Sequence, residues 1–256
     1  MTTFKNFFVF LQNMLIDIHA HLTNESFEKD IDAVVNNSSC SVILCNGTNP
    51  QDNRAVLKIC KRYNNVKPAL GIYPEEILKL TDKEIEDELK FIKKQHSAAI
   101  GEVGLDGTYG NLEKQSKYFR KFISLAEELN IPIIVHTRKA EKEVIDILEE
   151  LKAKKVILHC FMGKLKYAER AEKLGYHFSI PPIIVYAGQF QEMVKKISIT
   201  RLLTETDAPY LGPVKGERNE PANVQITVKK IAELKGMDAK EVENSIYLNY
   251  QRLFAK

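Results

Sequence analysis

The chain has 256 residues and a formal net charge of +3, from 37 basic and 34 acidic side chains. Hydrophobic residues make up 44% and charged residues 28%, which excludes the collagen-like, mucin-like and disordered classes. The mean hydropathy is −0.25, and no apolar run reaches the roughly 18 residues of a membrane span, so an integral membrane protein is also excluded. The net charge is too small to indicate a nucleic-acid partner by itself.

The N-terminal residues 1–13 contain a short apolar patch but lack the longer apolar core and cleavage site of a signal peptide. Met14 opens the first apolar strand, so we expect residues 1–13 to be an extension and residues 14–256 to form the domain. The four cysteines lack zinc-site spacing and are too few for a disulfide framework. We therefore expect reduced thiols and a cytoplasmic protein.

Short runs rich in Val, Ile and Leu alternate along the chain with longer stretches of helical period. The expected strands lie at residues 14–19, 41–45, 66–72, 98–104, 131–136, 155–160, 176–180 and 201–206. The expected helices lie at residues 25–37, 51–63, 81–95, 111–130, 139–152, 164–173, 186–197, 221–235 and 238–254. Several of the strand runs are continuously apolar, which is typical of parallel strands buried on both faces.

Eight units of a strand followed by a helix are the pattern of a (β/α)8 TIM-type barrel, and a length near 250 residues is typical of that fold. The chain has no evident linker, low-complexity tract or block of like charges. We therefore expect an α/β protein with a single domain. A doubly wound open sheet is the alternative, although it usually has fewer units.

Two histidines mark the end of the first expected strand. His19 is its last residue, and His21 follows two positions later. Residues i and i+2 of an extended segment point to the same side, so the two imidazoles can share a metal ion. A pair with this spacing is weak evidence by itself, because most such histidines are packed or surface side chains.

Four more side chains of metal-ligand type lie at or beside the ends of later strands, namely Glu102, His136, His159 and Asp207. In a TIM-type barrel the carboxyl ends of the strands meet at one mouth, where active sites are built. A glutamate at the end of an apolar strand is costly to bury without a partner, and a cation would supply one. Polar residues that merely begin loops would explain one or two of these positions, not all of them.

Six short motifs lie in order along the chain, namely DIHAHL (17–22), GEVGLD (101–106), VHTR (135–138), LHCFMG (158–163), TETDAPYL (204–211) and RNEPANV (218–224). With them the sequence resembles the TatD-type metal-dependent hydrolases and deoxyribonucleases of the amidohydrolase-like barrel superfamily. The resemblance implies one divalent cation bound by His19, His21, Glu102 and Asp207. It also implies a second cation bound by His136 and His159 and bridged to the first by Glu102.

The activity implied by the resemblance is phosphodiester hydrolysis in DNA, commonly as a 3′-exonuclease or a general DNase. Two cations roughly 3.5–4 Å apart can flank a phosphate, lower the pKa of a shared water and neutralise the leaving oxygen. Glu102 and Asp207 would be the catalytic carboxylates, with Asp207 orienting the water or taking its proton. The donor set leaves the metal open among Mg, Mn and Zn.

Substrate contacts are suggested by four basic side chains near the expected mouth, namely Arg138, Lys164, Lys215 and Arg218. A guanidinium or ammonium group there could bind a phosphate. If this cluster lines the mouth, a phosphate substrate is favoured. Solvated charges at the starts of helices are the alternative interpretation of the same residues.

Three further residues receive roles from their positions. Tyr73, in GIYP, stands where the family commonly has His, and it could donate a hydrogen bond or stack on a base. Glu205 could contact the substrate, or it could support the metal ligands from outside the metal site. Asp106 could be the outer carboxylate partner of a ligating histidine, or a turn residue. His96 and His177 are expected to be structural.

The leading hypothesis is therefore a two-metal nuclease acting on DNA ends or single strands, with no membrane association and no obligate protein partner. One alternative is an amidohydrolase-type enzyme that cleaves a small amide, ester or lactone with the same metal centre. Another is a barrel that binds a partner without catalysis, although such a protein has no need for a complete ligand set.

Overall fold

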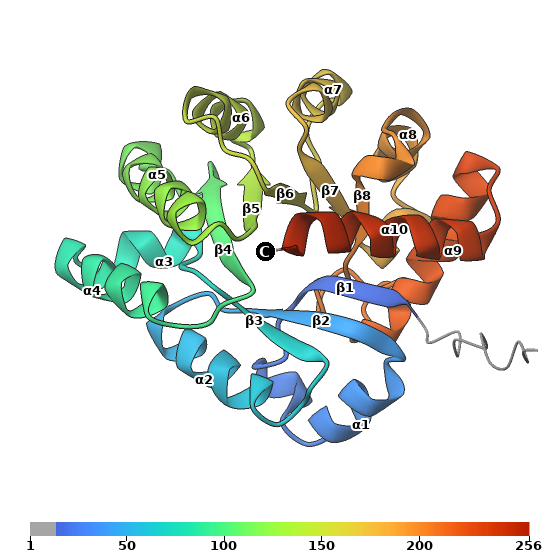
Figure 1. Cartoon of the computed structure of the whole chain (residues 1–256), viewed down its shortest axis with the longest axis horizontal. Helices are drawn as coiled ribbons and strands as arrows, with labels where there is room; N and C mark the ends of the chain where they lie inside the picture. Colours follow the sequence, from blue (N-terminus) through green and yellow to red (C-terminus); the bar gives the residue numbers. More distant parts are fainter. Residues whose placement is uncertain (1–13, 256) are drawn as a thin grey trace, which may run out of the picture.

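The computed structural model of this chain describes residues 14–255, so the expected extension 1–13 lies outside the described residues. It contains an eight-stranded sheet in which every strand pairs in parallel with the next one along the chain (Figure 1). The strands are β1 (Leu15–Ala20), β2 (Cys40–Asn46), β3 (Val66–Leu70), β4 (Ala99–Asp106), β5 (Ile133–Arg138), β6 (Val156–His159), β7 (His177–Ile180) and β8 (Leu202–Thr204).

The last strand returns to the first through main-chain contacts at its carboxyl end. The Asp207 amide donates to the His19 carbonyl at 2.7 Å, and the His21 amide donates to the Ala208 carbonyl at 2.8 Å. Ala20 and Ala208 form a parallel β-bridge. These contacts confirm the TIM-type barrel and exclude the open sheet, in which the first and last strands would not meet.

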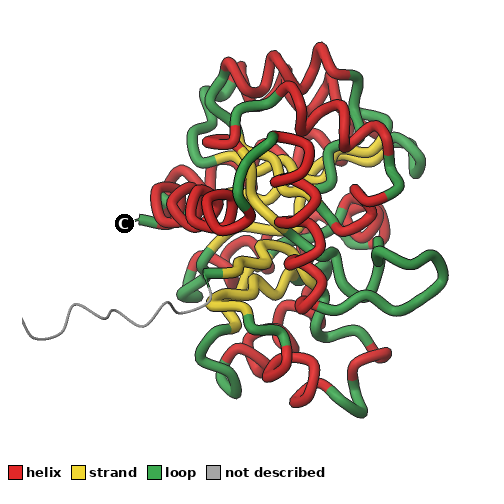
Figure 2. Tube along the Cα trace, turned by 90° about the vertical axis from the view of Figure 1, so that its right-hand side faces the viewer, coloured by secondary structure: helices red, strands yellow, loops and turns green. Residues whose placement is uncertain are grey.

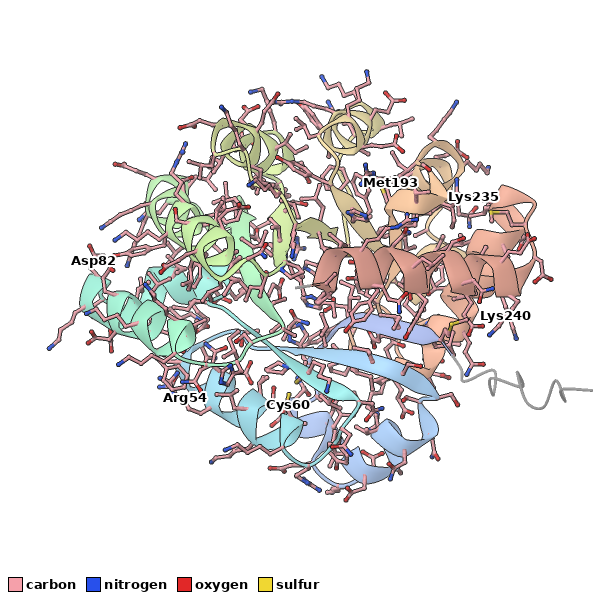
Figure 3. All side chains as sticks on the ribbon, viewed as in Figure 1. Arg54, Cys60, Asp82, Met193, Lys235 and Lys240 are labelled. Atoms are coloured by element: carbon pink, nitrogen blue, oxygen red, sulfur yellow. The ribbon has the colours of Figure 1, made fainter. Side chains whose placement is uncertain are left out.

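The helices lie around the outside of the strands, except α10, which crosses over one end of the barrel (Figures 1 and 2). They are α1 (Ile31–Asn37), α2 (Pro50–Cys60), α3 (Pro74–Lys79), α4 (Asp82–Lys93), α5 (Leu112–Leu129), α6 (Glu141–Glu150), α7 (Leu165–Lys173), α8 (Gly188–Lys196), α9 (Val224–Lys235) and α10 (Ala239–Phe254). Their outer faces carry charged pairs, for example Asp82 with Lys117 and Lys240 with Glu243; Asp82 and Lys240 are labelled in Figure 3.

Helix α10 closes the end of the barrel at which the strands begin (Figure 1). The Asn249 amide group donates to the carbonyls of Ile199 and Leu202, at 2.8 and 2.9 Å, where β8 starts. Lys155, just before β6, donates to the Ala255 carbonyl. We call this closed end the barrel floor, and the mouth is the opposite end. No helix in residues 14–255 is long and apolar enough to cross a membrane.

Several element boundaries differ from those expected. The single helix expected over 25–37 is wrong: a 3₁₀ turn at Glu25–Phe27, capped by Asn24, is separated from α1 by Asp30, whose φ of −139° is not helical. Helix α3 was not expected. Strand β4 continues to Asp106, and β8 stops at Thr204, so the loop after β8 carries the polar residues that follow it.

Candidate metal centre at the barrel mouth

The six expected ligand side chains all gather at the carboxyl ends of the strands. They come from β1 and the residue after it (His19, His21), from β4 (Glu102), from β5 and β6 (His136, His159) and from the loop after β8 (Asp207). Within each of two groups, one from His19, His21 and Asp207 and one from Glu102, His136 and His159, the ligand atoms lie within 4.8 Å of one another; a third such group joins His19 and His159 with Glu205. The parallel barrel therefore brings together residues that are up to 188 positions apart in the chain.

The first group surrounds a point between β1, β4 and β8. The Nε2 atoms of His19 and His21 lie 3.1 Å apart. Each lies 3.4–3.6 Å from Oε2 of Glu102 and 3.3–3.5 Å from Oδ1 of Asp207. Ligand atoms about 2.0–2.2 Å from a tetrahedral cation lie about 3.3–3.6 Å apart, so this donor set fits one divalent ion.

The second group uses the other oxygen of the same glutamate. Oε1 of Glu102 lies 3.0 Å from Nδ1 of His136 and 2.9 Å from Nε2 of His159, and these two nitrogens are 3.3 Å apart. Three ligand atoms at such spacing fit one face of a coordination shell, and catalytic sites keep the remaining positions open for water or substrate. Glu102 thus has one oxygen in each group.

Asp207 sits in a backbone conformation that L-residues adopt rarely. Its φ is 55°, and that of Cys160, the residue after His159, is 43°. Non-glycine residues in the left-handed region cost free energy and cluster at functional sites. The Asp207 amide is bonded to the His19 carbonyl, so the loop after β8 is fixed directly to the strand that carries the first ligand.

Outer contacts orient two of the imidazoles. Nδ1 of His21 lies 3.1 Å from the Asn46 carbonyl, which leaves Nε2 as the ligand atom. Nε2 of His136 lies 3.1 Å from Oδ2 of buried Asp106, which leaves Nδ1 as the ligand atom. Such partners fix the tautomer and ring plane of metal-binding histidines. Asp106 therefore lies where an outer partner belongs, and the Tyr73 hydroxyl donates to the same carboxylate oxygen at 3.1 Å.

Glu205 has no exposed surface. Its carboxylate accepts from the Cys160 amide at 2.9 Å and from the Ser179 hydroxyl at 2.6 Å, and its Oε2 lies 3.5 Å from Nδ1 of His159. It does not line the pocket at the mouth. These contacts favour a role in which Glu205 supports the ligating histidine His159 from outside the metal site. They do not favour the direct contact with substrate that the sequence also left open.

Asp17 and Thr206 were not singled out from the sequence, yet they fix the geometry of the first group. Asp17 is fully buried and accepts from the backbone amide of Thr206 at 2.9 Å and from its hydroxyl at 2.6 Å. Burial raises the pKa of this carboxyl to about 8, against the lowering effect of these hydrogen bonds. The sequence does contain a signal that could have identified Asp17, namely an acidic residue inside an otherwise apolar strand. Such a residue needs a fixed hydrogen-bond partner when it is buried.

The ligand side chains balance one another's charge. Burial by itself would raise the pKa of Glu102, but the neighbouring His159 and His19 hold it well below its usual range. Burial lowers the pKa of His21, yet the hydrogen bond and charge of Asp207 outweigh it and raise the pKa to about 9. Protons and divalent cations therefore compete for the same nitrogen atoms, and metal binding must release protons.

The ligands open into a pocket of about 790 Å³. Its walls carry three tyrosines, Tyr73, Tyr109 and Tyr210, together with Met162 and Arg138. Tyr109 is 41% exposed, Met162 46% and Tyr210 54%, so large apolar surfaces face solvent around the mouth. Exposed aromatic side chains next to a reactive centre are typical of a surface that binds a ligand.

The basic residues expected at the mouth do not gather there. Arg138 lines the pocket, whereas the other three do not. Arg218 pairs with Asp30 and Glu220, and Lys215 lies 5.1 Å from the centre of the Tyr186 ring. Lys164 is exposed just before α7. The expected phosphate-binding cluster is thus reduced to one arginine.

The comparisons with known proteins agree with this geometry. Residues 16–255 match the family described as TatD related DNase. The chain belongs to this family. The resemblance found in the motifs is therefore confirmed, and this TatD-family chain is a metal-dependent hydrolase that acts on ester bonds.

Relatives of this TatD-family chain match it over nearly its whole length. Human deoxyribonuclease TATDN3 is 36% identical over 260 residues, covering 94% of this chain and 95% of that protein. An uncharacterized metal-dependent hydrolase of Methanocaldococcus jannaschii is 34% identical over 245 residues, covering 94% and 97%. The crystal structure of the TatD homolog YJJV of Escherichia coli superposes with a TM-score of 0.88 at 26% identity, covering 96% and 100%.

Replacing Asp106 by asparagine should lower metal affinity or activity about 10–100-fold, because an outer partner of a metal-binding histidine is lost. The measurement is kcat/KM as a function of added metal, with the thermal midpoint as a check on folding. Asp87→Asn, on the exposed face of α4, removes the same charge and should change neither quantity. An Asp106→Asn enzyme with wild-type metal dependence would show that the contact to His136 is only structural.

Proposed function

We propose that this protein is a deoxyribonuclease of the 3′-exonuclease type that uses two divalent cations, drawn from Mg, Mn and Zn, to cleave phosphodiesters. The observation that carries the proposal is the position of Glu102, with Oε2 among His19, His21 and Asp207 and Oε1 between His136 and His159. A bridging carboxylate between two ligand groups is the arrangement that phosphoryl-transfer sites with paired cations require.

The side chains divide the work as follows. Bound cations supply Lewis acidity and make a water molecule acidic at neutral pH. Glu102 positions the two ligand groups relative to each other and places a negative charge in a buried site. The carboxylate of Asp207 faces the pocket, where it orients the attacking water and accepts its proton. Arg138 is placed on the pocket wall to bind a non-bridging phosphate oxygen.

We further propose that the substrate is single-stranded DNA or a DNA end. Duplex binding usually needs many cationic contacts to phosphates, and of the described basic residues only Arg138 lines this pocket. Base stacking on aromatic rings does not need such a charged groove. Tyr109 and Tyr210 stand on the walls with exposed rings, which supports binding of unpaired bases beside the scissile phosphate.

Replacing Tyr210 by leucine should raise KM for a single-stranded oligonucleotide about tenfold, since base stacking contributes about 1–3 kcal/mol per base. Tyr210→Phe is the matched control, because it keeps the ring and loses only the hydroxyl, which accepts from Asn24 at 3.3 Å. The effect should vanish for an oligonucleotide with abasic sites at its 3′ end. Equal losses for leucine and phenylalanine would exclude stacking.

A second candidate function is hydrolysis of a small amide, ester or lactone at the same centre. The separation of Lys164, Lys215 and Arg218 from the pocket favours it, because a small neutral substrate needs no basic groove. Tyr73 is compatible with this alternative too, since burial raises its pKa and its hydroxyl, which donates to Asp106, stays neutral.

The deciding assay follows a labelled single strand with metal-stripped protein to which Mg, Mn or Zn is returned separately. Metal-dependent ladders that grow from one end would establish an exonuclease and its polarity, and His136→Ala should remove them. If no metal restores cleavage of the strand, although elemental analysis finds bound metal, the assignment would change to a small-molecule hydrolase.

We also propose that the enzyme works in the cytoplasm. The four cysteines of the described chain form no disulfide, and burial raises the pKa of the thiols of Cys40, Cys45, Cys60 and Cys160. Buried, protonated thiols are compatible with a reducing compartment. Cell fractionation would test the location, and recovery of the protein from the culture medium would contradict it.

A further inference from the structure

A second cavity, of about 360 Å³, lies at the barrel floor, at the end opposite the metal centre. It is formed where β7 and β8 begin and where α10 passes over them. Its lining includes Lys154, His177, Thr200, Arg201 and Arg252, and no acidic side chain belongs to it. The three cationic residues and His177 come from separate elements of the chain, so only the fold brings them together.

The arginines of this cavity differ from most others in the protein. All eight arginines of the sequence lie in the described range, and five have a carboxylate partner. These five are Arg54, Arg62, Arg120, Arg170 and Arg218; Arg54 is labelled in Figure 3 between α2 and α4.

The three described arginines without a salt bridge are Arg138, Arg201 and Arg252, and all three line a cavity. Arg138 faces the metal pocket, and the other two face the floor cavity. One guanidinium N–H of Arg201 donates a hydrogen bond to the Gly175 carbonyl at 3.1 Å, which fixes the guanidinium at the cavity wall. The guanidinium groups without a carboxylate partner are thus the ones that line the two cavities.

His177 adds an independent observation. It is 7% exposed and lines the same cavity, and its buried Nδ1 atom has no hydrogen-bond partner among the described residues. Burial, together with the charges of Arg201 and Arg252, lowers the pKa of His177 to about 4. A buried polar atom without a partner, in a region of positive potential, is costly unless a ligand satisfies it.

We propose that the floor cavity is an anion-binding site for a phosphate-bearing small molecule, held by Arg201, Arg252 and His177, with Lys154 at its rim. A tetrahedral oxyanion with two or more charges suits this set, because each guanidinium presents paired donors that match two phosphate oxygens. A monoanionic carboxylate would leave most of the positive charge unbalanced. The site is distinct from the metal centre and does not depend on the proposed nuclease activity.

The test is an NMR titration of the metal-loaded protein, in which the ring signals of His177 are followed as inorganic phosphate or pyrophosphate is added. Saturable shifts are expected, with dissociation constants of about 1 mM or below and tighter binding of pyrophosphate. Arg201→Gln and Arg252→Gln should each weaken binding about tenfold. Lys173→Gln, which removes a charge from the end of α7 outside the cavity, should leave it unchanged.

Two further arms separate the floor cavity from the metal centre and from general salt effects. Glu102→Gln should leave the response of His177 to phosphate unchanged, since that glutamate lies at the mouth. Sodium chloride at matched ionic strength should not produce the shifts. His177 signals that do not change on addition of phosphate, or that titrate in both arginine variants with the wild-type dissociation constant, would overturn the proposal. Failure of the nuclease assay would not affect it.

Discussion

Replacement of Glu102 by glutamine is expected to reduce kcat/KM for the labelled strand by about 10³-fold or more, equal to ~4 kcal/mol of transition-state stabilisation. The neutral amide has the same shape but presents only one carbonyl oxygen, so it cannot serve both ligand groups. The metal content, measured by elemental analysis, should fall together with the activity. Both losses follow from one atom pair, Oε1 and Oε2, that lies within 3.6 Å of four histidine nitrogens.

The matched control is Glu217→Gln, an exposed glutamate in the loop between β8 and α9 that lines neither cavity. It should keep wild-type activity and metal content. A Glu102→Gln protein that retains both would contradict the two-cation scheme. A protein that retains metal but loses activity would assign Glu102 a role in the reaction instead of in metal binding.

Removal of metal by a chelator is expected to abolish activity and to lower the thermal midpoint. A cation present at about 1,000 times its dissociation constant stabilises the native state by about 4 kcal/mol. For a chain of this length, about 2–4 °C is lost per kcal/mol, so the midpoint should fall by about 8–16 °C. Differential scanning calorimetry before and after chelation, and after return of Mg, Mn or Zn, measures the shift.

His136→Ala provides the comparison for this experiment, because it removes one of the three ligands of the second group and leaves the first group complete. The thermal shift on adding metal should be smaller than in the wild type but not absent. An unchanged midpoint in wild-type protein, at metal concentrations that restore activity, would contradict this prediction, because it would mean that the cation does not bind the native state more tightly than the unfolded chain.

The gathering of six side chains of metal-ligand type at one mouth could be predicted because it depends on local features of the sequence. Each ligand lies in or just after a short apolar run, and parallel strands of a barrel end at one mouth whatever the details of packing. The prediction that His19 and His21 face the same side needed only the two-residue repeat of an extended chain. The expected outer contact of Asp106 also followed from the strand, since β4 and β5 are neighbours and place it opposite Arg138, two residues after His136.

The surroundings of the ligands could not be predicted in the same way. Arg218 meets Asp30, which is 188 positions away in the chain, and this pairing keeps its guanidinium out of the pocket. Glu205 and Asp17 are buried between strands, where their partners, Ser179 and Thr206, come from other elements. Contacts between distant segments decide whether a charged side chain faces solvent, pairs with a carboxylate or lines a cavity.

The sequence by itself determined the alternation of strands and helices and the barrel, because hydrophobic periodicity is a local property. It also predicted that six side chains of metal-ligand type would gather at the mouth, because strand ends are local features too. Only the tertiary structure decided which oxygen of Glu102 faces which histidines, and that Arg138 is the one expected phosphate contact at the mouth. It also placed Arg201 and Arg252 around His177. The physical reason is that hydrogen bonds and ion pairs act over a few ångströms, and only folding sets those distances.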